Sequence, residues 1–334
     1  MLREILEKNR EKKPMVHCMV NLVTANDCAN VVLASGACPI MAQDPEEVAQ
    51  VTAACDSLVL NLGTPSPRKI QALLLAGKAA KERGIPVIFD PVGVGCSDFR
   101  RQAAREILRQ VCPTIIRGNA SEIRTLLWGT LASRGVDAEV VEEDHLVLAK
   151  ELARATGAVV VLSGDVDIVT DGAVSYRVRN GHPMMRTVTG TGCQMSTLMG
   201  AYAAANPDKL LLAALAGVCA FGLCGEVAFG RLGPLDGNAS YRNYLIDGVY
   251  HLRGETLEKG AKYEICGIAA AAVCRYRPGL GGSADPFAAG GMRPARWCDL
   301  RTAAGEGTKC GSFSGRSQRN QGIVCPIWCA VSHQ

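Results

Sequence analysis

The sequence predicts a layered α/β fold in which a central, mostly parallel sheet is flanked by helices. Through most of the 334 residues, short β-rich runs alternate with longer segments of helical period. Several of the runs end directly in Gly, Asn or Asp, as strands do where a ligand binds at the carboxyl edge of an open sheet. With 48% apolar and 20% charged residues, the composition is that of a globular chain and excludes a disordered one.

The predicted strands are short runs of β-branched and aliphatic residues bounded by turn-forming residues. They cover residues 39–41, 57–62, 86–89, 114–116, 158–162, 168–170 and 175–179. The predicted helices follow a 3.6-residue apolar period. They cover residues 24–35, 67–83, 101–109, 145–156, 193–205 and 209–229, and the charged residues 1–13 are also helix-like.

Charge and cysteine usage exclude several classes of protein. Residues 265–334 carry eight Lys/Arg and three Asp/Glu, so the remaining 264 residues, with 28 against 29, lack the basic field that nucleic acid requires. The 15 cysteines follow no disulfide or zinc-finger spacing and are typical of free thiols in a reducing compartment. The longest uncharged apolar run, residues 210–225, is short for a membrane span. We therefore expect a cytoplasmic protein that binds neither nucleic acid nor membrane.

The strongest local signal is the run Val188-Thr189-Gly190-Thr191-Gly192-Cys193, which leads directly into an apolar helix. Two glycines let the backbone approach a ligand closely, and the helix N-terminus presents unpaired N–H groups. Such a turn is suited to bind an oxyanion or a transferring phosphoryl group. The alternative is an ordinary glycine-rich start of a helix.

Two further strand ends carry charged residues. Asp90 follows the strand 86–89, and Arg117 and Glu122 follow the strand 114–116. One or two carboxylates suffice to hold magnesium on nucleotide phosphates. Each residue also has a plain structural interpretation: Asp90 as a turn or cap residue, Glu122 as a solvated acid of a first helical turn, and Arg117 as an ion-pair partner of either acid. Their occurrence together with the Gly190 turn favours phosphoryl-transfer chemistry.

These segments, with several others in the same order, resemble the hydroxyethylthiazole kinase family. The matching segments are His17–Asn21, Asn26–Asn30, Gly36–Ala42, Asn61–Thr64, Asp90–Gly95, Arg117–Glu122, Ser163–Asp167 and Gly190–Cys193. The resemblance extends from about residue 14 to about residue 262. It implies a ribokinase-like fold and a homotrimer with substrate sites at the subunit interfaces.

The resemblance also implies roles for individual residues. Asp90 and Glu122 correspond to the magnesium-associated acids, and Arg117 and Ser163 to the contacts with the nucleotide phosphates. The family often has Thr at the position of Ser163, and Ser keeps the hydroxyl. The turn Gly190-Thr191-Gly192-Cys193 corresponds to the anion hole for the transferred phosphoryl group.

Three residues correspond to the thiazole pocket: Asn21, Val23 and Met41, of which Met41 is expected to reach across a subunit boundary. Core packing is the alternative for Met41. Cys193 stands where related sugar kinases carry an aspartate base. A thiol at a helix N-terminus can have a lowered pKa, so the role of Cys193 as base or as positioning group stays open. His17 is expected to be structural.

The implied reaction is attack by the hydroxyl of 4-methyl-5-(2-hydroxyethyl)thiazole on the γ-phosphate of ATP, with Mg²⁺, in thiamine biosynthesis or salvage. Other ribokinase-like kinases, acting on a hydroxymethylpyrimidine or a sugar, are the nearest alternative. A non-catalytic nucleotide-binding protein is an alternative from another class.

We predict a kinase domain at residues 1–264 and a tail at 265–334 that lacks apolar periodicity. A metal site at Cys325 and Cys329 lacks further ligands. When its possible codons are read displaced by one base, the tail can spell strings similar to the N-terminal part of thiamine phosphate synthase. Our hypothesis is an out-of-frame translation of that gene, which predicts a disordered tail; coding DNA incompatible with the shifted frame would refute it.

Overall fold

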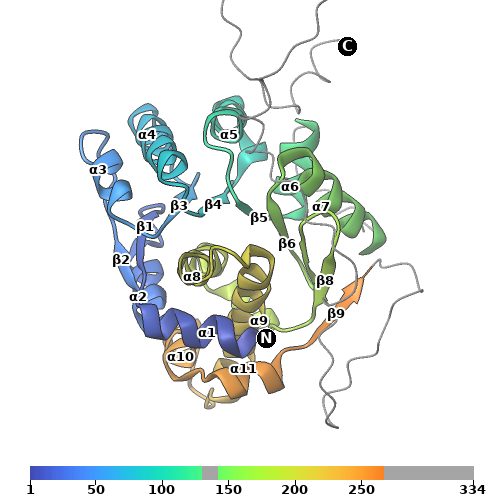
Figure 1. Ribbon diagram of the computed structural model, residues 1–334. Helices are drawn as coiled ribbons and strands as arrows, with labels where there is room; N and C mark the ends of the chain where they lie inside the picture. Colours follow the sequence, from blue (N-terminus) through green and yellow to red (C-terminus); the bar gives the residue numbers. More distant parts are fainter. Residues whose placement is uncertain (130–141, 267–334) are drawn as a thin grey trace, which may run out of the picture. The chain divides into compact units, whose positions relative to one another are not determined.

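The computed structural model describes residues 1–129 and 142–266, all within one compact unit. Nine strands in this part form one sheet of order β2-β1-β3-β4-β5-β6-β7-β8-β9 (Figure 1). The pairs from β2 to β6 are parallel, and the pairs from β6 to β9 are antiparallel. The predicted fold class, with a mostly parallel sheet flanked by helices, is confirmed.

The strands and helices have the following bounds. The strands are β1 Met15–Met19, β2 Cys38–Ile40, β3 Ser57–Asn61, β4 Val87–Asp90, β5 Ile115–Asn119, β6 Val159–Ser163, β7 Asp167–Thr170, β8 Ser175–Val178 and β9 Tyr263–Cys266. The α-helices are α1 Leu2–Lys12, α2 Ala25–Ser35, α3 Val48–Ala53, α4 Pro67–Arg83, α5 Asp98–Gln110, α6 Ala120–Trp128, α7 Glu142–Thr156, α8 Thr191–Ala205, α9 Leu210–Gly230, α10 Asn238–His251 and α11 Gly254–Gly260. Two 3-10 helices, η1 Val94–Cys96 and η2 Pro183–Thr187, lie in loops.

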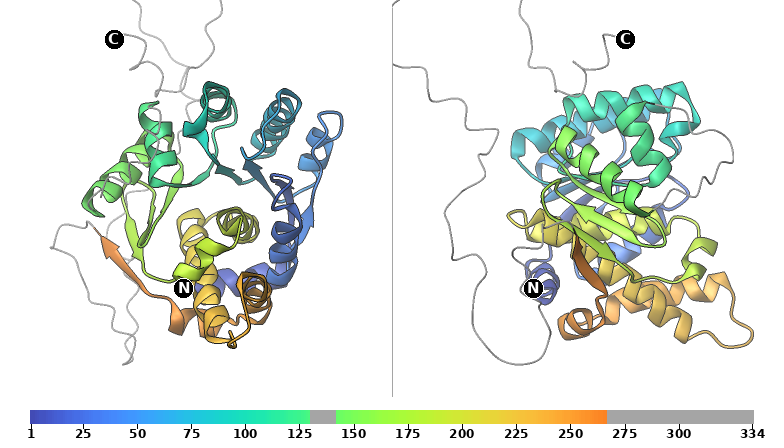
Figure 2. Two further views of the ribbon diagram at one scale, coloured as in Figure 1. Left: turned by 180° about the vertical axis from the view of Figure 1, so that it is seen from behind. Right: turned by 90° about the vertical axis from the view of Figure 1, so that its right-hand side faces the viewer.

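The sheet divides the interior into two apolar layers. Successive residues of a strand point to opposite faces, so Val59 packs with helices α1, α2 and α8–α11, whereas Leu58 and Leu60 pack with α3–α7. The curved sheet surrounds α8 and α9 on its inner side, and α4 to α7 lie outside it (Figures 1 and 2). Both faces are covered, as the parallel pairing of β1 to β6 requires.

The innermost helices explain the apolar runs of the sequence. The helix α9 is the one described helix long and apolar enough to cross a membrane, and 67% of its most apolar window is buried in the fold. A helix that is apolar on all sides is a core helix when protein surrounds it. The expectation that this run is not a membrane span agrees with its packing.

All seven predicted strands and all six predicted helices are present, with ends shifted by at most three residues. The helix α4 has the predicted bounds because its end signals are local: Ser66 accepts a hydrogen bond from the backbone N–H of Lys69, Pro67 is the first helical residue, and Gly84 ends the helix with φ 66°. The strands β1 and β9 and the helices α3, α6, α10 and α11 were not predicted.

The strand β9 runs two residues beyond the predicted domain boundary at Glu264. Ile265 pairs with Tyr176 and Cys266 pairs with Ser175, so both belong to the sheet. The predictions for the rest of the tail, including the order of residues 267–334, lie outside the described residues.

Candidate functional site

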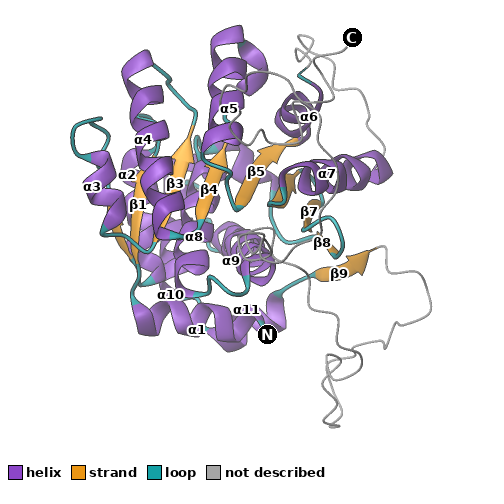
Figure 3. Ribbon diagram, turned by 45° about the horizontal axis from the view of Figure 1, so that its top comes forward, coloured by secondary structure: helices purple, strands orange, loops and turns teal. Residues whose placement is uncertain are grey.

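The carboxyl ends of β3, β4 and β5 meet the N-terminus of α8, and polar side chains gather there. Figure 3 shows these strands as neighbouring arrows of the sheet. Asp90, the last residue of β4, is fully buried. Its Oδ2 accepts hydrogen bonds from Asn61 Nδ2 at 2.8 Å and from Ser196 Oγ at 3.2 Å, while its Oδ1 has no hydrogen-bond partner. The nearest cation is Arg117, with Nη1 4.0 Å from Oδ1.

The environment of Asp90 opposes ionisation. Burial, together with the negative charge of Glu122, outweighs the attraction of Arg117 and raises the pKa of Asp90 to about 6. At neutral pH the group is still a carboxylate, and one of its oxygens is free to bind a cation or a donor. A buried carboxylate with such a perturbed pKa beside a glycine turn is typical of a functional site.

Asn61 connects the residues of the site. Its amide nitrogen donates to Asp90 and lies 3.2 Å from Cys193 Sγ. Its carbonyl accepts from Asn21 Nδ2 at 3.2 Å and from the backbone N–H of Gly63 at 2.9 Å. Asn61 is therefore held in one orientation, with its donors toward Asp90 and Cys193.

Asn61 and Ser196 were missed among the predicted site residues. Asn61 stood in a recognised segment, and its position at the end of a buried strand was the available signal. Ser196 follows Cys193 by three residues on the same face of α8. Nothing local distinguishes it from a core serine.

Cys193, in the first turn of α8, is a buried neutral thiol. Burial, and next the charge of Asp90, raise the pKa of Cys193 to about 12. The lowered pKa that a helix N-terminus can give a thiol is therefore not found at Cys193. Asn21 Nδ2 and Asn61 Nδ2 both point at its sulfur, at 3.5 and 3.2 Å. At neutral pH the group is a thiol and cannot act as a thiolate base.

The two glycines of the turn make room for neighbouring side chains. Gly190, the N-cap of α8, has φ 80°, and a Cβ there would lie 2.1 Å from Thr24 Cγ2. A Cβ on Gly192 would lie 2.2 Å from Arg117 Nη1. The absence of side chains thus lets the guanidinium approach the start of α8, where Thr191 is the first helical residue.

Glu122 caps the helix that follows β5. Its Oε2 accepts from the backbone N–H of Asn119 and its Oε1 from that of Gly93, both at 2.9 Å. With the Asn119 side chain accepting from Glu122 N, this forms a capping box. The structural interpretation of Glu122 is therefore realised in the fold, and each oxygen keeps a further lone pair for a water or an ion.

The remaining predicted residues make contacts of their own and none with Asp90 or Cys193 among the described hydrogen bonds. Ser163, at the end of β6, donates to Gly118 O at 3.3 Å. Val23 is 66% exposed, and Met41 is half-buried against the inner core. His17 is fully buried with Nδ1 2.8 Å from Thr52 Oγ1 and Nε2 3.0 Å from Ala42 O, so its ring joins β1 to α3 and to the loop after β2, as expected of a structural histidine.

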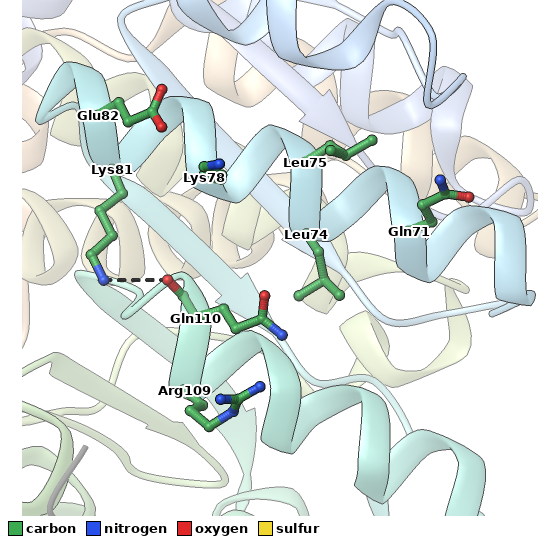
Figure 4. A pocket seen from close by; sticks show the side chains of 8 residues that line it. All are labelled: Gln71, Leu74, Leu75, Lys78, Lys81, Glu82, Arg109 and Gln110. Atoms are coloured by element: carbon green, nitrogen blue, oxygen red, sulfur yellow. Dashed lines mark hydrogen bonds between the residues drawn. The ribbon is translucent and has the colours of Figure 1, made fainter. Parts of the chain in front are cut away.

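A groove of about 640 Å³ lies elsewhere, between α4 and α5 on the outer layer (Figure 4). It runs past Leu74 and Lys78 toward Arg109. It contains none of the residues at the strand ends and no buried carboxylate. The polar side chains described above therefore lie at the carboxyl edge of the sheet and not in this groove.

Comparison with known proteins gives the family. The model of the hydroxyethylthiazole kinase family matches residues 6–255. A hydroxyethylthiazole kinase of Clostridium acetobutylicum is 48% identical over 79% of this chain and 99% of its own length. The corresponding kinase of Methanoculleus marisnigri is 43% identical over 78% and 92%. The chain belongs to the hydroxyethylthiazole kinase family.

Solved structures agree with this assignment. The hydroxyethylthiazole kinase of Pyrococcus horikoshii superposes with a TM-score of 0.72 at 32% identity, covering 79% of this chain and 98% of that one. A pyridoxal kinase of Staphylococcus aureus in complex with AMP-PCP has a TM-score of 0.52 at 14% identity over 75% and 97%, and shows the ribokinase-like fold alone. The predicted family, fold and activity, a kinase acting on hydroxyethylthiazole in thiamine biosynthesis, are confirmed, and ATP is the co-substrate that a kinase of this family implies.

Proposed function

We propose that the chain transfers the γ-phosphoryl group of ATP to the hydroxyl of 4-methyl-5-(2-hydroxyethyl)thiazole at the cluster formed by Asp90, Arg117 and Cys193. The observation that carries this proposal is the convergence of a buried carboxylate, a guanidinium and a thiol at the N-terminus of α8. Phosphoryl transfer needs positioning and charge stabilisation more than covalent help from the protein, and this cluster supplies both.

The phosphate side of the reaction falls to Arg117, Ser163 and the start of α8. The unpaired N–H groups of the first turn of α8 and the guanidinium of Arg117 lie together, so both place positive charge at the start of this helix. Arg117 Nε is buried without a hydrogen-bond partner, so the side chain has donor capacity left for a phosphate oxygen. The Gly190–Cys193 turn forms the hole in which charge develops on the transferred group.

Asp90 and Glu122 are the proposed residues for Mg²⁺. No group of three or more His, Cys, Asp or Glu in the described residues could hold a metal ion by itself. This agrees with an ion bound mainly through phosphates, water and one or two carboxylates. The partnerless Oδ1 of Asp90 fits such an ion, and Glu122, engaged in its capping box, fits it through water. When bound, Mg²⁺ supplies positive charge to the phosphates.

The acceptor side is formed by Cys193, Asn21, Val23 and Met41. Because the Cys193 thiol stays protonated at neutral pH, we assign it the positioning of the acceptor hydroxyl and not the removal of its proton. A loose transition state asks little of a base. Asn21 holds the loop after β1 by accepting from the backbone N–H groups of Val23 and Thr24.

We further propose a cytoplasmic homotrimer whose sites lie at subunit interfaces. Leu22 and Val23, beside the site, are 78% and 66% exposed in the single chain. Two adjacent exposed apolar residues next to the proposed reacting centre support the view that a second subunit covers them, with Met41 reaching across the subunit boundary. Light scattering of the purified chain tests this: a monomer would refute the assembly.

The deciding experiment is phosphorylation of hydroxyethylthiazole by ATP, run beside hydroxymethylpyrimidine and ribose, with Mg²⁺ and with EDTA. We expect turnover of the thiazole alone, lost with EDTA, and lost in Asp90→Asn. The matched control is Asp98→Asn, an exposed acid at the start of α5. Preference for the pyrimidine would refute the substrate, and a fully active Asp90→Asn variant would refute the site.

A further inference from the structure

Two cations outside the reacting centre hold the loops that present it. Lys69, in the first turn of α4, is only 8% exposed, and its Nζ donates to Gly63 O at 2.6 Å and to Val20 O at 3.3 Å. Arg100, in the first turn of α5, donates from Nη1 to Leu62 O at 3.0 Å and to Val92 O at 2.6 Å. The four carbonyls lie in the loops after β1, β3 and β4.

The position of Lys69 is unfavourable by itself. A cation in the first turn of a helix faces the positive end of the helix dipole, and burial penalises its charge. Burial, and with it the positive charge of Arg100, lower the pKa of Lys69 to about 8. Within residues 1–129 and 142–266, no carboxylate contributes to its stabilisation. In that part of the chain the ammonium group of Lys69 donates hydrogen bonds to backbone carbonyls only, so these hydrogen bonds hold the loops in place.

The hydrogen bonds lead from these cations to the reacting residues. Arg100 binds the carbonyl of the Leu62–Gly63 peptide, and the N–H of that same peptide donates to Asn61 Oδ1. Polarisation of a peptide at its oxygen strengthens donation at its nitrogen. Asn61 then donates to both Asp90 and Cys193. The side-chain amide of Asn61 therefore cannot rotate to exchange its oxygen and nitrogen without breaking the hydrogen bond from Gly63 N.

Lys69 acts on the neighbouring peptides in the same way. Its bond to Val20 O holds the peptide that precedes Asn21, and its bond to Gly63 O holds the peptide that follows the Gly63 N–H. Asn21 in turn bonds Asn61 Oδ1 and lies 3.5 Å from Cys193 Sγ. Lys69 thus joins the loops after β1 and β3. Asn21, in the first of these loops, and Asn61, the last residue of β3, both contact the thiol.

We propose that Lys69 is a positioning residue for the acceptor side of the site, which with Arg100 fixes Asn21 and Asn61 on Cys193 and Asp90. The inference rests on the proposed location of the reaction at Asp90 and Cys193. A positively charged Lys69 holds the loops after β1 and β3 together through two charge-assisted hydrogen bonds, and weakening or removing these bonds lets both asparagines rotate. The proposed phosphate contacts, Arg117 and Ser163, lie on β5 and β6 and not on the two loops that Lys69 holds.

Lys69→Met tests this, with Lys78→Met as the control, since Lys78 is an exposed lysine of the same helix (Figure 4). We expect Lys69→Met to lose about tenfold in kcat/KM for hydroxyethylthiazole at pH 7, with KM for ATP within about twofold of the wild type. In the wild type, kcat/KM should fall toward the variant's level through a step near pH 8, because the neutral amine keeps two N–H donors but loses the charge that strengthens both hydrogen bonds. Lys69→Met should lack that step, and Lys78→Met should match the wild type throughout.

Three results would overturn the proposal. They are a kcat/KM of Lys69→Met within twofold of the wild type at pH 7, a step near pH 8 that persists in Lys69→Met, and a rise in KM for ATP as large as the fall in kcat/KM for the thiazole. Should Lys69→Met fail to fold, Lys69→Arg decides, because its guanidinium stays charged: a step that persists there refutes the proposal, and its absence supports it. An active Asp90→Asn variant would instead refute the location of the site.

Discussion

Replacement of Gly192 by alanine separates catalysis from stability. Gly192 is the second residue of α8, and its φ lies outside the left-handed range, so alanine fits the backbone. Its Cβ, however, would lie 2.2 Å from Arg117 Nη1 and 2.8 Å from Arg117 Cζ. Non-bonded heavy atoms settle at about 3.5 Å, so the guanidinium must retreat by roughly 1 Å. Arg117 is the proposed contact of the ATP phosphates.

A displacement of about 1 Å in a phosphate-positioning group costs on the order of 100-fold in rate, or about 2.7 kcal/mol of transition-state stabilisation. Alanine in place of glycine in a helix stabilises the fold by about 0.5–1 kcal/mol. We therefore expect kcat/KM of Gly192→Ala to fall about 100-fold while its unfolding temperature stays constant or rises. The outcome combines a loss of activity with no loss of stability.

The assay measures the ADP released during hydroxyethylthiazole phosphorylation, and thermal unfolding is followed in the same preparation. Gly230→Ala, at the end of α9, is the control, because no atom lies within 4 Å of the position that its Cβ would take. Retention of more than about a third of wild-type kcat/KM by Gly192→Ala would refute the positioning role of Arg117. A fall in unfolding temperature comparable to that of a core mutation would show that the close approach serves the fold instead.

Three other variants test the site and the domain boundary. Asp90→Asn should lower turnover by at least about 100-fold yet raise the unfolding temperature at pH 7.5 in metal-free buffer. The pKa of Asp90 is about 6 in the folded protein and about 4 in the unfolded chain, so the free energy of unfolding of the wild type falls as the pH rises from about 4 to about 6, and asparagine removes this loss. An unchanged or lower unfolding temperature would contradict the burial argument. Cys193→Ala should keep turnover within about tenfold of wild type and raise KM for the thiazole, since a protonated thiol positions the acceptor hydroxyl and does not remove its proton. A loss of turnover of 1,000-fold or more would indicate instead that Cys193 acts as the base. Truncation after Cys266 should leave kcat and KM unchanged, and an inactive truncated chain would show that residues 267–334 contribute to the kinase.

Local signals determined which elements were predictable. The helix α4 carries its own cap residues, so its bounds could be read from the sequence. The strand β1 contains the buried polar residue His17 in a five-residue run, and only its pairing with β2 and β3 makes it a strand. The strand β9 is likewise defined by its pairing with β8, since two of its four residues are exposed. Tertiary context overrides propensity for such short segments.

The same distinction applies to the site. Asp90 and Arg117 could be predicted because parallel strands end at one edge, which places their last residues together. Asn61 and Ser196 could not, because their roles depend on how α8 is rotated against the sheet. One face of this helix meets Val16 and Val59 through Gly200, and that packing turns Ser196 toward Asp90. No sequence signal encodes that rotation.

Cys193 shows why the sign of a pKa shift needs the tertiary structure. A helix N-terminus stabilises a nearby negative charge by about 0.3–1 kcal/mol, which lowers a thiol pKa by less than about one unit. Burial and the facing carboxylate of Asp90 act in the opposite direction and raise the pKa of Cys193 from 9.0 to about 12. The opposing effects are therefore unequal by more than about 3 kcal/mol, and the local rule fails. Burial first, and next the charge of the proposed magnesium-associated acid Asp90, therefore keep the thiol of α8 protonated.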